Sequence, residues 1–249
     1  MTKRKKRMRG LWLVLTAALL LVALRLLAAP EIPVGLRVYA RTHGFSPSEY
    51  PQALIALYKR NADARTFVQD YPLRRNDTPE INLSAEITPG EVPLLMQWDE
   101  RWGYREYNEN FMGLSGCGPT CLSMVAIYLT GDTTMDPYWM AQYAERGGYN
   151  VPGSGTAWSF FSDGARALGI DVTEIGMDES RILDNLAVGN PIVCVVGPGD
   201  FTTEGHFIVL TGTRDGLICV NDPNSIRNSE KLWSFAQLQG QVQSLWVMR

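Results

Sequence analysis

Cys117 carries the strongest indication of chemistry in this sequence. It lies in the turn Gly116-Cys117-Gly118-Pro119, directly before an apolar segment that predicts a helix ending at Gly131. A thiol at a helix N-terminus lies at the positive end of the helix dipole, which favours the nucleophilic thiolate. The flanking glycines permit a tight turn and the close approach of a substrate carbonyl. A buried structural cysteine is the alternative, and we assign that role to Cys121, one helical turn further on.

A nucleophilic cysteine needs a base, and the chain contains only two histidines. His43 lies close to the N-terminal apolar segment and outside the region around Cys117. His206 begins the apolar run HFIVLTG, which predicts a strand with the histidine at the rim of a sheet. His206 is therefore the candidate base, and the alternative is a structural histidine at a strand edge.

Asp222 is the candidate partner that orients the ring of His206. It ends the run LICVND, the next predicted strand along the chain. Asn221 and Asn224 are the nearest rivals for this role. An Asp-Pro turn that merely ends a strand is the structural alternative.

The connection between these two strands decides whether His206 and Asp222 meet. We expect a three-residue loop, 214–216, with Gly216 in the left-handed conformation. Ile208 would then pair with Asp222, and His206 would be its diagonal neighbour, about 7–8 Å away on the same face. A two-residue loop would place the two side chains on opposite faces.

Gln97, in LLMQWDERWG, is the candidate for stabilising an oxyanion. Its amide can donate a hydrogen bond to the developing charge together with the backbone N–H of Cys117. A glutamine next to a tryptophan is also an ordinary structural feature, so this role depends on the other three residues.

The cysteines do not indicate a metal site. The chain has no Cys-x-x-Cys motif and no zinc-ligand spacing, so we expect neither metal nor organic cofactor. Cys194 and Cys219 lie in strongly apolar strands, where a cysteine acts as a small core residue. A disulfide between them is the alternative.

The order of predicted elements in residues 90–249 indicates the fold class. Helices come first, beginning at Cys117 and covering Trp139–Ala144, Thr156–Leu168 and Asp178–Val188, with a glycine-rich loop at Gly147–Gly155. Four β-branched runs then follow: PIVCVVG, HFIVLTG, LICVND and SLWVM. This order predicts an α+β domain with N-terminal helices packed on an antiparallel sheet.

Residues 30–89 predict a small helical appendage and a linker. Ser46 or Ser48 would cap a first helix, and Asn61 or Asp63 a second that ends at Tyr71-Pro72. Phe67 and Val68 would face inward. The polar, turn-rich segment 74–89 is the predicted linker.

The motifs of the main domain resemble a known family when they are taken in order. Gln97-Trp98, Trp102-Gly103, Gly116–Thr120, Gly205–Phe207 and Asn221–Pro223 resemble peptidases related to bacteriocin-processing, double-glycine-leader peptidases, family thirty-nine of the cysteine type. The resemblance covers residues 90–249 and implies a papain-like fold. It also implies the roles of nucleophile, base, orienting partner and oxyanion donor for Cys117, His206, Asp222 and Gln97.

The resemblance leaves the substrate open. Bacteriocin processors are usually fused to an ABC transporter and act on the cytoplasmic side, whereas this sequence shows no transporter. The glycine-rich stretches Val151–Thr156 and Gly197–Thr203 would line a cleft for an extended, glycine-containing peptide.

The start of the chain predicts a membrane anchor. Residues 1–10 form a basic tail, and Leu11–Ala29 is an apolar run about long enough to cross a bilayer. The basic tail would remain in the cytoplasm, so residues 30–249 would lie outside it. Cleavage near Ala28–Ala29 would instead release a secreted protein.

The charge of the body argues against nucleic-acid binding. Seven of the 23 basic residues and none of the 26 acidic ones lie within residues 1–30, which leaves a net charge of −10 on the remainder. We therefore expect a membrane-anchored, extracytoplasmic cysteine peptidase of undetermined oligomeric state, acting on a peptide. The alternatives are a peptidoglycan amidase or endopeptidase of the same fold, and an inactive peptide-binding module.

Overall fold

The computed structural model describes residues 32–249, so the predicted basic tail and anchor lie outside the described residues. None of the helices between residues 32 and 249 is long and apolar enough to cross a membrane. The chain divides into two compact units, of which one ends at Ile55 and the other spans Ala56–Arg249.

The first unit is a short helical segment. Helix α2 (Val34–Thr42) buries Leu36 and Ala40, which are four residues apart and therefore share a helix face. Ser46 caps the 3₁₀ turn η1 (Pro47–Glu49) in a capping box rather than capping the helix α3 (Gln52–Arg60) that follows.

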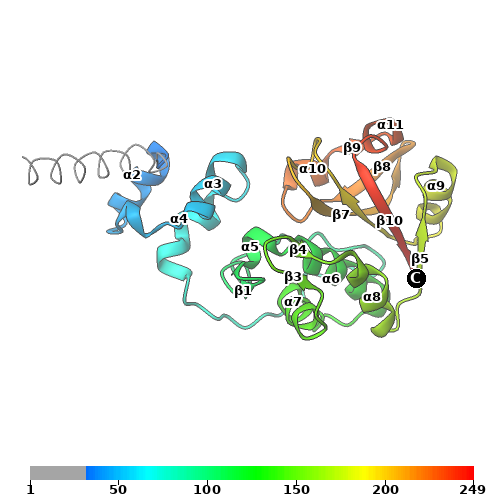
Figure 1. Cartoon of the computed structure of the whole chain (residues 1–249), viewed down its shortest axis with the longest axis horizontal. Coiled ribbons are helices and arrows are strands. Elements are labelled where there is room, and N and C mark those ends of the chain that lie inside the picture. The colour runs from blue at the N-terminus through cyan, green and yellow to red at the C-terminus, as the bar shows by residue number, and fades with distance from the viewer. Residues whose placement is uncertain (1–31) are drawn as a thin grey trace, which may run out of the picture. The chain divides into compact units, whose positions relative to one another are not determined.

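An antiparallel sheet of six strands organises the second unit (Figure 1). The strand order is β5-β10-β6-β7-β8-β9, and every neighbouring pair is antiparallel. The bounds are β5 Val172–Ile175, β6 Ile192–Val196, β7 His206–Arg214, β8 Leu217–Asn221, β9 Leu232–Trp233 and β10 Val242–Met248. The four predicted strands are confirmed as β6, β7, β8 and β10, whereas the short edge strands β5 and β9 were not predicted.

Helices and two small hairpins complete this unit. The helices are α4 (Arg65–Arg74), α5 (Met112–Ser115), α6 (Cys117–Thr130), α7 (Pro137–Arg146), the 3₁₀ turn η2 (Trp158–Phe161), α8 (Asp163–Ala167), α9 (Glu179–Ala187), α10 (Ile226–Glu230) and α11 (Phe235–Leu238). The hairpins are β1 (Glu106–Tyr107) with β2 (Asn110–Phe111), and β3 (Asn150–Val151) with β4 (Gly155–Thr156). The predicted combination of helices with an antiparallel sheet is confirmed.

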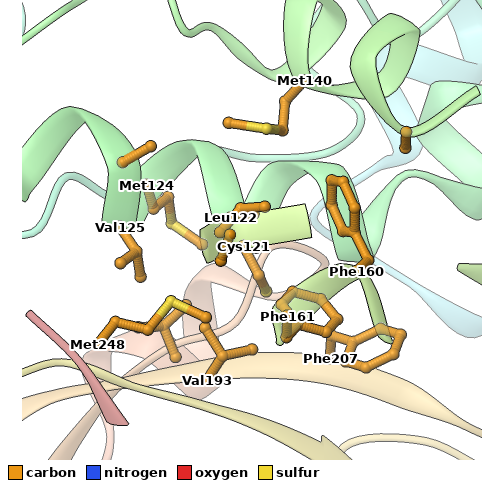
Figure 2. Close-up of a cluster of buried hydrophobic side chains, with 14 of the residues drawn as sticks. Cys121, Leu122, Met124, Val125, Met140, Phe160, Phe161, Val193, Phe207 and Met248 are labelled. Atoms are coloured by element: carbon orange, nitrogen blue, oxygen red, sulfur yellow. The ribbon is translucent and has the colours of Figure 1, made fainter. Parts of the chain in front are cut away.

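Both faces of the sheet are covered, which explains why its central strand β6 is apolar and buried along its whole length. Val193 and Phe207 belong to the core cluster that contains α6 and α7, and Figure 2 shows them below α6. Cys194 and Ile208, the next residues along the same strands, belong to a second cluster with α9. Successive side chains of a strand point to opposite faces, so a sheet covered on both sides has no polar alternation.

Helix α6 is the central helix of the larger core. Its residues from Gly118 to Ile127 are all buried, and Gly131, in the left-handed conformation, ends it as predicted. A helix that is apolar on all sides must be surrounded by protein, and α6 indeed lies between α7 and the sheet (Figure 2).

Two predicted helices differ in the structure. The segment Thr156–Leu168 is not one helix, because Gly155–Thr156 pairs with Asn150–Val151 and the Ala157 N–H donates to the carbonyl of Tyr149 at 2.7 Å. Only η2 and α8 follow. The loop predicted at Gly147–Gly155 is therefore largely this hairpin.

Helix α4 also differs from the prediction at both of its ends. Its N-cap is Ala64 rather than Asn61 or Asp63, and the helix continues through Pro72 to Arg74. Phe67 and Val68 are buried as predicted. Asp63 is unavailable as a cap because its carboxylate accepts hydrogen bonds from the start of α10 instead.

The β7–β8 turn corrects the predicted loop but not the register at the site. Asp215 and Gly216 form a two-residue turn with φ of 54° and 75°, the values of a type I′ hairpin. A β-bulge at Thr211 then adds one residue to β7. Beyond the bulge Val209 pairs with Asn221, which is the register that the three-residue loop would have produced.

Candidate active site

Cys117 is the first residue of α6 and is partly exposed. The two flanking glycines serve close packing, because neither position has room for a side chain. A Cβ on Gly116 would lie 2.5 Å from the Met112 carbonyl oxygen, and one on Gly118 would lie 2.5 Å from Oγ1 of Thr156. The glycines therefore let α6 begin tightly against α5 and β4, which presents the thiol at the helix terminus.

His206 and Asp222 meet at one edge of the sheet. His206 begins β7 and Asp222 directly follows β8, and since these strands are antiparallel neighbours, the two residues lie at the same end. Nε2 of His206 lies 2.8 Å from Oδ1 of Asp222, and their side chains are only 7% and 1% exposed. The sequence prediction that these two side chains are within reach is confirmed.

The charges around His206 favour its protonated form. Burial by itself lowers the pKa of the imidazole, but the Asp222 carboxylate and a hydrogen bond with Cys117 raise it by more, to about 10. Nε2 is bonded to Asp222, so Nδ1 is the ring nitrogen that this contact leaves unoccupied. The arrangement Cys117–His206–Asp222 therefore places a cationic imidazole in the same pocket as the Cys117 thiol.

Both oxygens of the Asp222 carboxylate take part in hydrogen bonds. Oδ1 also accepts from the backbone N–H of Asn224 at 2.8 Å, and Oδ2 accepts from the side-chain amide of Asn228 at 2.8 Å. Asn228 was missed by the sequence analysis. The pattern that would have found it is Ser225-x-x-Asn228, a helix N-cap that brings the chain back toward Asp222, since Ser225 Oγ accepts from the Asn228 N–H.

The two rivals of Asp222 have other partners. The Asn221 amide donates to the carbonyls of Val92 and Pro93, at 3.1 and 3.0 Å. Asn224 supplies the backbone N–H just described and is not bonded to the histidine ring. Asp222 is therefore the residue that contacts His206.

Gln97 is buried next to the Asp222 segment and lines the same pocket as Cys117. Its backbone N–H donates to the carbonyl of Pro223 at 2.7 Å, and its Nε2 donates to the carbonyl of Gly113 at 3.0 Å. A carboxamide carries two N–H donors, so the second one remains for a group in the pocket. Oε1 has no hydrogen-bond partner in the described part of the chain.

All four predicted site residues line one pocket of about 480 Å³, which is within the range typical of ligand sites. The loop Gly199–Gly205 and the turn Arg60–Asp63 complete its walls. The predicted glycine-rich stretch Gly197–Thr203 thus contributes in part. The stretch Val151–Thr156 does not belong to the lining.

The other cysteines are structural. Cys121 points into the core in Figure 2, and burial raises its pKa well above the usual value. Burial likewise raises the pKa of Cys194. Cys194 and Cys219 are free thiols on strands separated by β7, so the alternative of a disulfide between them is wrong.

Within residues 32–249 there is no group of three or more histidine, cysteine, aspartate or glutamate side chains placed to hold a metal ion.

The fold and the site together define a papain-like cysteine peptidase domain. Residues 90–248 match the family model described as the Peptidase_C39 like family. These residues are more than half of the chain, so the chain belongs to this family and is a hydrolase of the cysteine-peptidase type. The resemblance inferred from the motifs is confirmed.

Solved structures of the same kind are similar to the chain at low identity. The peptidase domain of Streptococcus ComA, a bi-functional ABC transporter involved in a quorum-sensing pathway, is 21% identical, covers 53% of this chain and 89% of its own, and has a TM-score of 0.41. A double glycine motif protease from an AMS/PCAT transporter, in complex with the leader peptide, is 16% identical, with 64% and 92% covered and a TM-score of 0.43. A C39-like peptidase from Bacillus anthracis is 15% identical, with 64% and 96% covered and a TM-score of 0.39. No curated protein matches the chain.

Proposed function

We propose that this chain is a membrane-anchored, extracytoplasmic peptidase in which Cys117 is the nucleophile, His206 the base, Asp222 the orienting partner and Gln97 an oxyanion donor. The observation that carries the catalytic part is the position of His206, whose Nε2 is bonded to Asp222 and which lines the same pocket as Cys117, close enough for Cys117 to raise its pKa. A structural histidine at a strand edge needs neither the carboxylate nor the thiol.

The reaction follows from this arrangement. The Cys117 thiolate adds to the carbonyl carbon of the scissile peptide bond, and the oxygen becomes an oxyanion. The free N–H of Gln97 and the backbone N–H of Cys117 stabilise this charge, because the first N–H groups of a helix have no acceptor within the helix.

Proton transfer by His206 completes both halves of the reaction. The imidazolium donates its proton to the leaving amine as the C–N bond breaks, which leaves a thioester on Cys117. The neutral imidazole then removes a proton from water, which attacks the thioester and releases the carboxylate product. Asp222 stabilises the charged ring before the first half and after the second.

Labelling with a peptide electrophile that reacts with active-site thiols tests the nucleophile. Wild-type protein is expected to be labelled stoichiometrically, and Cys117→Ala should not react. Cys219→Ala is the matched control, because Cys219 is also partly exposed but lies on β8, and it should react like wild type. Labelling of Cys117→Ala at the wild-type rate would refute the proposal.

The role of His206 is tested by the rate of the same labelling. His206→Ala is expected to react much more slowly at neutral pH, because the thiolate loses its imidazolium partner. An unchanged rate would mean that Cys117 is activated without the histidine.

We propose a peptide substrate, and we test the location of the enzyme in the cell separately. Purified protein should release new amino termini from an extended peptide library, whereas digestion of peptidoglycan alone would favour the cell-wall hydrolase.

The basic tail 1–10 and the apolar run 11–29 support the anchor. In intact cells a membrane-impermeant form of the same peptide electrophile should label wild type and not Cys117→Ala, and an equal lack of labelling in both would contradict an outward orientation.

A further inference from the structure

We propose that Asn61 and Asp63, in the turn between α3 and α4, are positioning residues of the active site, which hold the segment Pro223–Asn228 so that Asp222 meets His206. The turn lies outside residues 90–248, the part of the chain that matches the family model. The inference rests on the proposed function and adds an element to it.

Asn61 binds the segment at Asn224. Its side-chain Nδ2 donates to the backbone carbonyl of Asn224 at 2.6 Å and to Oδ1 of the same residue at 3.0 Å. Its own Oδ1 accepts from the backbone N–H of Asp63 at 3.0 Å, which fixes the shape of the turn. The amide of Asn61 therefore connects two segments that are 163 residues apart.

Asp63 accepts three hydrogen bonds from the same segment. Its Oδ2 accepts from the backbone N–H of Ile226 at 2.9 Å and, at 3.4 Å each, from the backbone N–H of Arg227 and Oγ of Ser225. Hydrogen bonds to a carboxylate are stronger than those between neutral groups. Asp63 thus fixes the beginning of α10 from outside that helix.

The segment held in this way is also the one that holds Asp222. The N–H of Asn224 donates to Oδ1 of Asp222, and the Asn228 amide donates to Oδ2, both at 2.8 Å. Oδ1 is the oxygen that contacts Nε2 of His206. A displacement of Asn224 or α10 would therefore rotate or move the carboxylate relative to the imidazole.

The turn is itself anchored to the peptidase domain. The ring of Phe67 on α4 is stacked on Tyr104 with centroids 4.4 Å apart, and the Tyr104 hydroxyl donates to the carbonyl of Phe67 at 2.7 Å. Because α4 is fastened in this way, the turn can act as a fixed support for the segment it contacts.

The test compares Asn61→Ala and Asp63→Ala with wild type in steady-state kinetics on a peptide that the wild type cleaves. A misplacement of about 1 Å can cost up to about 100-fold in rate. We expect kcat to fall about tenfold in each variant, with KM changed less than about twofold, by the same principle. The charged groups that act on His206 are Asp222, after β8, and the Cys117 thiolate on α6. A weakened contact with Asp222 should therefore also move the alkaline limb of the kcat profile to lower pH.

Two conservative variants separate positioning from folding. Asp63→Asn keeps an acceptor oxygen for the N–H of Ile226 and should recover most of the activity. Asn61→Asp keeps the acceptor for the Asp63 N–H but replaces the Nδ2 donor with an oxygen that faces the Asn224 carbonyl, so it should be as impaired as Asn61→Ala. These variants give a result even where an alanine variant does not fold.

Asn82→Ala is the matched control. Asn82 Oδ1 also accepts from the backbone N–H two residues later, Ser84, at 3.0 Å, and it also lies outside the matched residues, but it does not line the pocket. It should have the wild-type kcat and pH profile.

The outcomes are distinct. Wild-type kcat and pH profile in Asn61→Asp and Asp63→Ala, with only a lower melting temperature, would overturn the inference, since the turn would then act on stability alone. A rise in KM without a change in kcat would also overturn it, because it would indicate direct contact with substrate. Turnover that survives in Cys117→Ala would instead refute the proposed function.

Discussion

His206 Nε2 lies 2.8 Å from Asp222 Oδ1, and the other oxygen of this carboxylate accepts from the Asn228 amide. The carboxylate is thus held from two sides, and its charge is directed at the imidazole. Burial alone would lower the pKa of His206, but the charge and the hydrogen bond of Asp222 raise it by more. The pH dependence of activity should therefore report on it.

Asp222→Asn should lower the alkaline limit of activity. In the proposed mechanism catalysis begins from the imidazolium, which is present below the pKa of His206, about 10 in the wild type. Asparagine keeps an acceptor for Nε2 but removes the negative charge, so that pKa falls and the limb moves to lower pH. At a pH above both limbs, each unit of movement lowers activity about tenfold. The measurement is kcat over KM as a function of pH.

Asp200→Asn is the control for this experiment. Asp200 also lines the pocket, but its carboxylate accepts from the Gln241 amide at 3.2 Å and is not bonded to His206. The alkaline limb of the pH profile of Asp200→Asn should coincide with that of the wild type. If the limb of Asp222→Asn also coincided with it, the Asp222 carboxylate would not be the group that keeps His206 protonated.

Gln97→Met should reduce turnover without impairing the thiol. Methionine has a similar volume but no donor, so the oxyanion would lose one hydrogen bond and kcat should fall by roughly 10²–10³-fold. Alkylation of Cys117 by a small haloacetamide forms no oxyanion, and its rate should stay at the wild-type value. Turnover close to wild type in this variant would exclude Gln97 from the oxyanion site.

Gly113→Ala should destabilise the contact between α4 and the peptidase domain. A Cβ on Gly113 would lie 2.6 Å from Cζ of Phe67, and overpacking of this kind costs about 1–3 kcal/mol. Phe67→Leu shortens the ring side chain, so the double variant should recover part of that free energy of unfolding. Chemical denaturation of the four proteins in this cycle measures the coupling.

Gly176→Ala is the control for the cycle, because a Cβ there would meet no atom within 4 Å and its backbone needs no left-handed conformation. It should change stability little. Strictly additive effects of Gly113→Ala and Phe67→Leu would show that the ring does not fill the space left by the glycine.

Several features of the site followed from local sequence patterns. The start of α6 at Cys117 and its end at Gly131 were predicted from glycines on either side of an apolar segment. His206 and Asp222 were placed at strand ends because apolar runs begin or stop there. Such signals depend on neighbouring residues, so the sequence contains them directly.

The supporting contacts could not be obtained in this way. Asp63 looked like an N-cap for its own helix, but it binds the N–H of Ile226, 163 residues further along the chain. Phe67 was expected to face inward, but the space it fills is left by glycines in a different segment. Partners so distant in sequence depend on how the elements pack together.

The sequence by itself determined which groups are the candidates for the chemistry: a thiol at a helix terminus, an imidazole and a carboxylate at strand ends, and a carboxamide upstream. The tertiary structure alone decided that they meet. The turn at Asp215-Gly216 would separate His206 from Asp222 in register, and the bulge at Thr211 restores it. A bulge is stabilised by the sheet and core on both sides of the strand, whereas the identity of a reactive group is a property of its own side chain.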